Sequence, residues 1–142
     1  MLTPAFAASA VLLYGAPSSP LAQPRNTVLG HLGCALLGVA LRRLLVDLPA
    51  WPASAAARGG AEALAGTLAV AGATAGMMLC GVTHPPGAAT ALIAVVGGEA
   101  ITSLGFLYVP LVLAMSLVAV SAAFLLNNLS ALPVRRYPAF AL

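Results

Sequence analysis

The chain has 142 residues, of which 61% are hydrophobic and 6% are charged, and its formal net charge is +3. Soluble domains carry about a quarter charged residues, so this composition excludes a water-soluble globular domain and predicts an integral membrane protein. The arginines are scattered between apolar stretches and form no basic stripe, which argues against nucleic acid as a partner; they are Arg25, Arg42, Arg43, Arg58, Arg135 and Arg136.

Five apolar segments follow one another along the chain, and each is expected to be helical. The first, 2–14, rises only about 20 Å, which is short for an apolar membrane core of about 30 Å. The next two, 27–46 and 61–82, flank a linker, 47–60, that we expect to be an interfacial loop. The last two are 86–104 and 106–126. We predict an all-α membrane protein, a compact bundle of about four transmembrane helices plus a short N-terminal hydrophobic helix, with residues 1–142 as a single domain.

The fourth segment leaves two topologies open. A full span would put the linker 47–60 and the C-terminal tail on opposite sides of the membrane. A re-entrant helix over 86–96, rising about 16 Å, would put both on one side. Segment length favours the full span, in which case the arginines lie on both sides and give no orientation.

Two proline breaks interrupt the apolar sequence, one at Pro24 in QPRNT and one at Pro85 and Pro86 in THPPG. Proline suits the first turn of a helix, so each break is expected to begin a new helix. Thr83 is the expected N-cap of the second helix, and Asn26 or Thr27 that of the first. Helix starts of this kind favour anions, and transporters use broken helices in this way.

Three polar residues near these breaks have a functional and a plain interpretation. Arg25 either faces a cavity, a partner or a substrate, or holds a lipid phosphate at the membrane surface. His31 follows on the same helix and is able to point to the same place. His84 either carries a proton, because histidine has a reference pKa of about 6.5, or only orients the turn.

The small and polar residues inside the later spans also leave alternatives. Gly72 and Gly76 form a GxxxG pattern, which we assign to internal packing rather than to dimerisation. Glu99 is expected at a surface turn, with a pairing to an interior arginine as the alternative. Asn127 and Asn128 are interface residues, C-capping groups or pore lining.

Catalysis receives no support from the sequence. It contains no nucleophile elbow, no paired carboxylates, no HExxH and no P-loop, and its acids and histidines are too few for most metal sites. Cys34 and Cys80 stand alone in apolar surroundings and are expected to be packing residues. We therefore expect a protein that is not an enzyme and has no cofactor or metal.

Three stretches of the chain resemble the HPP family of integral membrane proteins: PAFAASAVLLYGAPSSPLAQPRNTVLGHLG (4–33), THPPGAATAL (83–92) and LLNNL…RRYP within 125–138. The resemblance implies a compact bundle of four main transmembrane helices with the His-Pro-Pro motif between two of them. Members in plant chloroplasts and cyanobacteria are linked to nitrite transport. Members usually have a further apolar segment upstream, which we expect to be missing here, and their motif often continues Gly-Gly where this chain has Gly87 and Ala88.

These observations together predict an integral membrane transporter of a small anion, with nitrite as the leading candidate. The two proline breaks are expected to meet and to bind the anion and any coupled proton; the expected site residues are Arg25, Asn26, His31, Thr83, His84, Pro85, Pro86, Gly87 and Thr90. The alternative is a non-transporting scaffold or subunit assembled through its small-residue helices. The expected partners are the lipid bilayer and the anion, with a homo-oligomer left open, and the expected location is the bacterial inner membrane, as a multi-pass protein.

Overall fold

Three long apolar helices form the frame of the molecule. The computed structural model describes residues 4–48, 54–129 and 136–140, and all the regular structure in this part is helical. The helix α2 (Pro24–Arg42) continues into a wider turn, η3 (Arg43–Asp47), and the other two are α3 (Ala55–Leu79) and α6 (Tyr108–Leu129). With 24 or 25 residues, each of the three apolar stretches is long enough to cross a membrane. The prediction of an all-α membrane fold is confirmed.

Two shorter apolar helices complete the bundle. The first segment forms α1 (Pro4–Ala10) and a wider turn, η1 (Val11–Gly15), so it is short as predicted. The fourth segment is not one long helix, so the prediction that a single helix crosses the bundle here is wrong. Its helix α4 (Pro85–Val96) has 12 residues and rises about 18 Å. It ends because Gly97 and Gly98 follow, and Gly98 has a φ of 78°, which residues other than glycine rarely adopt.

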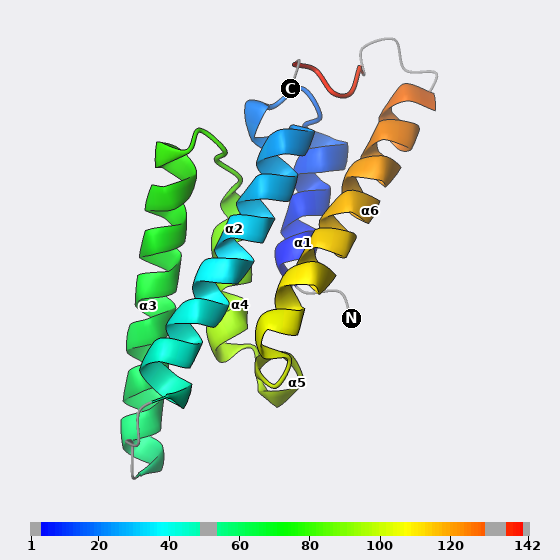
Figure 1. Cartoon of the computed structure of the whole chain (residues 1–142). Helices are drawn as coiled ribbons and strands as arrows, with labels where there is room; N and C mark the ends of the chain where they lie inside the picture. The colour runs from blue at the N-terminus through cyan, green and yellow to red at the C-terminus, as the bar shows by residue number, and fades with distance from the viewer. Residues whose placement is uncertain (1–3, 49–53, 130–135, 141–142) are drawn as a thin grey trace.

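The chain nevertheless reaches the opposite end of the bundle after α4. Two short elements, α5 (Glu99–Thr102) and η4 (Gly105–Leu107), turn it into α6, which runs back along the molecule (Figure 1). The tail, 136–140, then packs against the start of α2, where the amide of Ala139 donates to Gln23 Oε1 at 2.9 Å. The tail and the end of α2 that precedes the linker are therefore at opposite ends, as expected for a full span.

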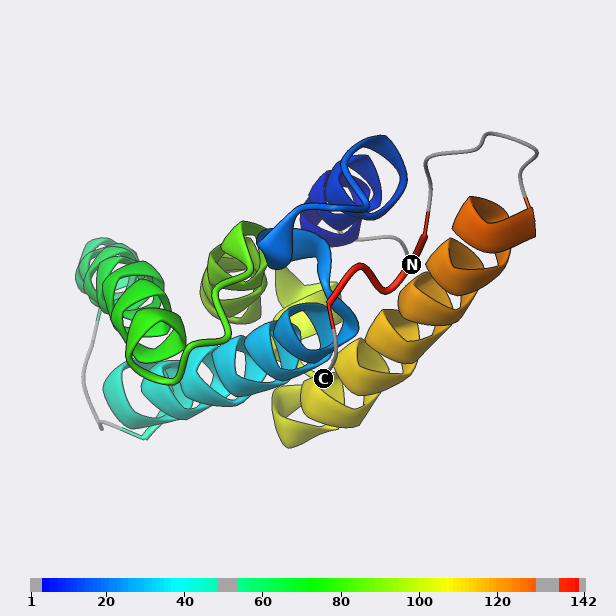
Figure 2. The same cartoon turned by 90° about the horizontal axis from the view of Figure 1, so that it is seen from above.

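The helix α2 is the centre of the arrangement. It contacts α3, α4 and α6, and α3 and α6 lie on opposite sides of it (Figures 1 and 2). The short helix α4 also packs on α3, and α1 contacts α4 and α6. Much of α6 is left uncovered, and its exposed large apolar side chains are those of Leu111, Leu117, Val118, Phe124, Leu125, Leu126 and Leu129. This surface suits contact with lipid.

Small residues let α2 and α4 approach closely. A Cβ atom added at Gly38 would lie 2.9 Å from Ala91 Cα, and one added at Gly87 would lie 3.1 Å from the carbonyl oxygen of Gly30. The GxxxG pattern does not make such a contact throughout: a Cβ at Gly76 would meet nothing within 4 Å. The prediction that this pattern serves internal packing thus agrees with Gly72, where an added Cβ atom would lie 3.2 Å from Leu37 Cδ2, and is wrong for Gly76.

Polar residues at the helix ends have mostly local roles. Glu99 is exposed as the first residue of α5, which confirms the surface turn. Asn127 is buried and its Nδ2 donates to Leu13 O at 2.9 Å, joining α6 to η1. Asn128 Nδ2 donates to the carbonyl of Tyr137 at 2.6 Å and so holds the tail.

The predicted interfacial loop is shorter than expected. The helix α3 already begins at Ala55, with Ser54 as its N-cap: Ser54 Oγ accepts from the amide of Ala57 at 3.3 Å. Residues 55–60 are therefore helical, while 49–53 lie outside the described residues.

Candidate functional site

Four fully buried polar side chains meet where α1, α2 and α4 come together. They are Ser9 on α1, His31 on α2, His84 immediately before α4, and Thr90 on α4, and each has 0% of its surface exposed. The ring of Phe6 stacks on that of His31, with centroids 4.4 Å apart. Buried polar groups need hydrogen-bond partners, because burial without them is costly. We call these four residues the histidine cluster.

Each ring nitrogen of the two histidines has a partner. Ser9 Oγ lies 2.7 Å from His31 Nε2 and 2.9 Å from His84 Nε2. On their other sides, His31 Nδ1 lies 2.7 Å from Thr90 Oγ1, and His84 Nδ1 lies 2.7 Å from the carbonyl oxygen of Leu21. Ser9 therefore bridges two rings that are otherwise held from different elements.

The partners determine where the hydrogens lie when both rings are neutral. The carbonyl of Leu21 only accepts, so His84 Nδ1 carries a hydrogen and His84 Nε2 accepts from Ser9. The hydroxyl of Ser9 is then used, so Ser9 Oγ accepts from His31 Nε2, and His31 Nδ1 accepts from Thr90. The hydrogen bonds all run in one direction, from Thr90 to Leu21.

The proline pair places His84 at the start of this arrangement. Pro85 and Pro86 occupy the first turn of α4, where their missing N–H groups leave nothing unpaired. His84 itself is the N-cap, with an extended backbone, so the prediction of Thr83 as N-cap is wrong. The amide of Gly87 donates to the carbonyl of His84 at 2.8 Å. The amide of Gly87 is therefore already paired within the first turn of the helix.

The first break differs from its prediction in the same way. The N-cap of α2 is Gln23 rather than Asn26 or Thr27, and it caps without its side chain. The side chain of Asn26 instead crosses to the second break, where Nδ2 donates to Thr83 O at 3.1 Å. The two proline breaks, far apart in the sequence, are therefore in direct contact.

Arg25 does not join the histidine cluster. It is exposed and lines a groove of about 410 Å³ between α2 and α3. His31, which is able to share a site with Arg25 by sequence, is instead buried in the cluster. The other lining residues are mostly small or apolar: Leu29, Gly30, Gly33, Cys34, Leu37, Gly72, Ala73, Gly76, Met77, Cys80 and Val82. We call this space the α2–α3 groove.

The α2–α3 groove and the histidine cluster are neighbours. Gly30 lines the groove, and a Cβ atom added at Gly30 would lie 2.9 Å from the Cβ of His84 and 3.2 Å from the carbonyl oxygen of Val82. Val82 lines the groove as well. The backbone at Gly30 therefore separates His84 from the groove by little more than its own thickness.

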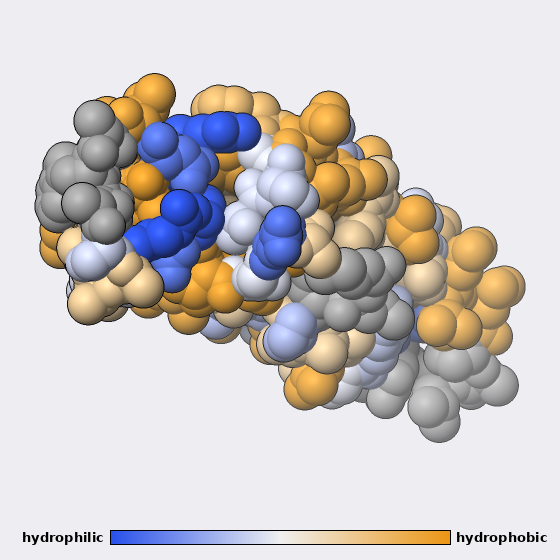
Figure 3. All heavy atoms as spheres, turned by 90° about the horizontal axis from the view of Figure 1, so that it is seen from below, coloured by the Kyte–Doolittle hydropathy of each residue, from blue (hydrophilic) through white to orange (hydrophobic). Residues whose placement is uncertain are grey.

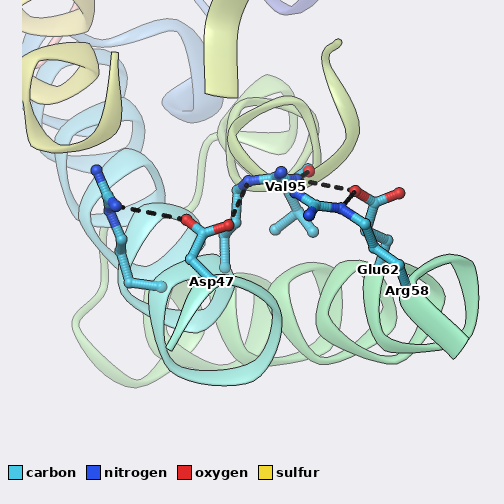
Figure 4. A network of polar contacts seen from close by, with 6 residues as sticks. Asp47, Arg58, Glu62 and Val95 are labelled. Carbon is cyan, nitrogen blue, oxygen red and sulfur yellow. Dashed lines mark hydrogen bonds and ion pairs between the residues drawn. The ribbon is translucent and has the colours of Figure 1, made fainter. Parts of the chain in front are cut away.

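A second polar cluster lies at the opposite end of the bundle (Figures 3 and 4). Arg42 is buried there and donates to the carbonyl of Val95, while its Nε and Nη1 lie 3.5 Å from Asp47 and 3.3 Å from Glu62. Two exposed arginines pair with the same acids: Arg43 with Asp47 at 3.6 Å, and Arg58 with Glu62 at 3.7 Å. Arg43 and Arg58 are thus exposed, whereas Arg42 is buried.

The sequence predicted neither that Ser9 is part of the site nor that Arg42 is buried. Ser9 belongs to the stretch 4–33 that resembles the HPP family, but its one chemical signal is a hydroxyl within a short apolar segment. Arg42 stands next to Arg43, and nothing local distinguishes the two. Among the residues described, no group of three or more His, Cys, Asp or Glu side chains is placed to hold a metal ion.

Comparisons with known proteins agree with the membrane fold. The family described as "HPP, transmembrane region" matches residues 1–138. Two transmembrane proteins of Dictyostelium discoideum are similar to the chain. One is 44% identical over 136 residues, which is 95% of this chain and 40% of that protein. The other is 38% identical over 141 residues, which is 99% of this chain and 45% of that protein. The chain thus spans less than half the length of these relatives, and no solved structure matches it.

Proposed function

The chain belongs to the HPP transmembrane family, and from this premise we propose that it transports a small anion across the membrane, with nitrite as the leading candidate. The observation that carries the proposal is the position of the histidine cluster directly behind the α2–α3 groove. Polar and ionisable side chains inside a membrane bundle are costly, and they usually line the path of a substrate or ion. Broken helices near such residues are common in transporters.

Arg25 would attract the anion to the groove. Its guanidinium is always charged and matches the planar oxygens of nitrite in the way it matches a carboxylate. Because Arg25 is exposed while the rest of the groove is largely apolar, the anion would meet a positive charge at the rim and little polar surface beyond it. Further movement then needs a second positive charge, which His84 would supply when protonated.

The other predicted site residues would support this path rather than touch the anion first. Asn26 and Thr83 hold the two breaks together. Pro85, Pro86 and Gly87 form the turn that positions His84. Thr90 is the hydrogen-bond partner of His31.

A structural role for the cluster is the second candidate function. The observation in its favour is that both histidine rings are fully buried and paired at every nitrogen, so the cluster by itself joins three helices. In that case the chain is a membrane scaffold or subunit, and the open groove beside Gly76 would receive a second copy or another membrane protein.

Catalysis is not part of the proposal. The contact of Ser9 Oγ with His84 Nε2 at 2.9 Å is within the range of a nucleophile and its base. Ser9, however, has no exposed surface, so a substrate would need the helices to separate before it could reach the hydroxyl. A fluorophosphonate probe that labels Ser9 in the folded protein would overturn this assignment.

Anion flux into liposomes tests the proposed function. Purified protein is reconstituted, and uptake of nitrite, nitrate, formate and chloride is measured for the wild type, Arg25→Gln, His84→Ala and Arg136→Gln. Arg136 is the matched control, because it is an exposed arginine at the same end of the bundle as Arg25. We expect flux of at least one anion, a loss of that flux in Arg25→Gln and His84→Ala, and little change in Arg136→Gln.

Folding is checked for every variant by its elution as a single species and by its thermal unfolding. Undetectable flux of all four anions by folded wild-type protein would overturn the proposal. Variants that assemble normally and leave a partner's function intact would then favour the scaffold. The bacterial inner membrane is the location we propose for this transport, and the two relatives come from a eukaryote.

A further inference from the structure

We propose that the histidine cluster is a binding site for one proton, and that the Ser9 hydroxyl passes this proton between His31 and His84. The site follows from the geometry of the hydrogen bonds. Its coupling to an anion in the α2–α3 groove rests on the proposed function.

The neutral cluster can bind a proton on His84 without leaving a polar group unpaired. Ser9 Oγ lies 3.1 Å from the carbonyl oxygen of Ala5, so its hydroxyl has a second acceptor on its own helix. If His84 Nε2 gains a hydrogen, the Ser9 hydroxyl turns to Ala5, and Ser9 Oγ accepts from both His84 and His31. All the polar groups stay paired in this state.

The cluster can also bind the proton on His31 with every polar group paired. Thr90 Oγ1 lies 3.4 Å from the carbonyl oxygen of Pro86, one turn back on α4. If His31 Nδ1 gains a hydrogen, Thr90 accepts from it and turns its own hydroxyl to Pro86. The longer distance to Pro86, compared with that from Ser9 to Ala5, makes this the weaker of the two positions.

Ser9 connects the two rings by a transfer of two hydrogens. With the proton on His31, the Nε2–H bond of His31 breaks as Ser9 Oγ takes that hydrogen, and the original O–H bond of Ser9 breaks as His84 Nε2 takes the other. One N–H and one O–H bond break and one of each forms, so no further reactant is needed. The positive charge moves from α2 to the start of α4, and His31 keeps its remaining hydrogen on Nδ1, toward Thr90, while the Ser9 hydroxyl donates to His31 Nε2. The return of His31 to its Nε2 tautomer, with the Ser9 hydroxyl on Ala5 O, is a separate step.

The surroundings limit the cluster to one proton. The two rings are 4.8 Å apart between centroids, so a first positive charge opposes a second. Apart from the histidines, the titratable groups nearby are Cys34 on α2, next to Gly87, and Tyr108 on α6, whose hydroxyl donates to Thr90 O at 3.4 Å. No carboxylate contacts either ring within the described part of the chain.

A protonated cluster therefore lacks a negative partner of its own. An anion at Gly30, on the other side of the groove wall, would supply one. Proton and anion should then favour each other's binding, and this linkage is reciprocal. Such coupling lets the pair cross the apolar interior with its charges balanced.

Nitrogen NMR of the full chain in lipid nanodiscs tests the proton site, because it separates the two neutral tautomers of histidine from the imidazolium form. With ¹⁵N-labelled histidine at alkaline pH, we expect His31 to carry its hydrogen on Nε2 and His84 on Nδ1. On acidification or on addition of nitrite, we expect the imidazolium signal of one proton, shared between both rings. The same tautomer in both rings, or two protons taken up independently, would overturn the proposal.

Three variants distinguish passage through Ser9 from simple burial. In Ser9→Ala the two rings should titrate separately, and sharing of the signal should be lost. Ser116→Ala is the matched control, because Ser116 is an equally buried serine that donates to Val112 O on its own helix and should leave the spectra unchanged. If Ser9→Ala does not fold, Thr90→Val removes the partner of His31 Nδ1 and should confine the proton to His84. Unchanged sharing in every folded variant would overturn the role of Ser9.

The liposome assay separates this inference from the proposed function. The predicted tautomers and a shared proton without anion flux would support the proton site and overturn transport. Flux with two rings that do not share a proton would support transport and overturn the site.

Discussion

Arg42 donates a hydrogen bond to the carbonyl of Val95, and so joins the end of α2 to the last turn of α4 (Figure 4). The carbonyl groups at a helix C-terminus carry a partial negative charge, which a buried guanidinium satisfies well. The same guanidinium pairs with Asp47 and Glu62, so it connects α2 to three further elements, η3, α3 and α4, at this end of the bundle.

Arg42→Gln should lower the free energy of unfolding by about 2–3 kcal/mol, because it removes a charged donor from a buried carbonyl and from two acids. Arg43→Gln is the control: Arg43 is exposed and shares the acid Asp47, and its loss should cost less than about 1 kcal/mol. Thermal unfolding in detergent or nanodiscs measures both. Equal losses would contradict the assigned importance of the buried contact.

Gly38→Ala should destabilise the bundle, whereas Gly33→Ala on the same helix should not. The added methyl at Gly38 would lie 2.9 Å from both Ala91 Cα and Ala94 Cβ, so α2 and α4 must separate, at a cost of about 1–3 kcal/mol. At Gly33 it meets nothing within 4 Å. Unfolding temperatures of the two variants, measured side by side, check this. An unchanged unfolding temperature of Gly38→Ala would mean that α4 moves away from α2 without cost.

Cys80 should react selectively with maleimides, and a bulky adduct there should inhibit flux. Cys80 is exposed at the end of α3 and lines the α2–α3 groove, whereas Cys34 lines it from a buried position. We expect one label per chain by mass spectrometry, and loss of flux after labelling that Cys80→Ser prevents. Normal flux through a fully labelled protein would exclude the groove as the path.

A reagent that does not cross membranes gives the sidedness of the same residue. Cys80 and the start of α2 lie at one end of the molecule, because both line the groove with Arg25. Labelling of intact, sealed vesicles therefore reports which side of the membrane Arg25 faces.

Tyr137→Phe should loosen the tail. The Tyr137 hydroxyl donates to Ala22 O at 2.9 Å, and losing this bond should cost about 1 kcal/mol. Because that free energy corresponds to a factor of roughly five in the open population, hydrogen exchange at Ala139 should be roughly fivefold faster. Exchange measured by mass spectrometry on tail peptides checks this, with α3 peptides as the control. An unchanged exchange rate would show that the tail is held by Gln23 and Asn128 alone.

Docking of the tail should also depend on pH. Burial, with a contribution from Tyr14, raises the pKa of Tyr137 to about 12. A raised pKa means that the folded state holds the proton more firmly than the unfolded one, whose value is about 10. The stabilisation is therefore complete below about pH 10 and is lost as the pH rises toward 12. The protection of Ala139, taken relative to the intrinsic base-catalysed exchange rate at each pH, should fall over that range in the wild type and stay constant in Tyr137→Phe.

Much of the fold was predictable because its signals are local. The length of the apolar segments predicts the three long helices, and a proline begins both α2 and α4. The contact of the two breaks agrees with the predicted meeting of these turns.

What could not be predicted depends on which helix faces touch. Arg25 and His31 share a helix, and only packing against α1 and α3 decides that one lines a groove while the other is enclosed. Ser9 gains its importance from two rings that come from distant segments. The length of α4 depends on Gly98, whose positive φ ends the helix well before the apolar sequence ends.

The single direction of the hydrogen bonds in the histidine cluster has a consequence for descent within the family. A replacement at any one of the four positions leaves a donor facing a donor, or an acceptor without a hydrogen, inside an apolar interior. We therefore expect Ser9, His31, His84 and Thr90 to be inherited as a set. Lineages that lose one of them should have exchanged the others too, whereas Gly33, where an added Cβ atom would meet nothing within 4 Å, should tolerate exchange with other small residues.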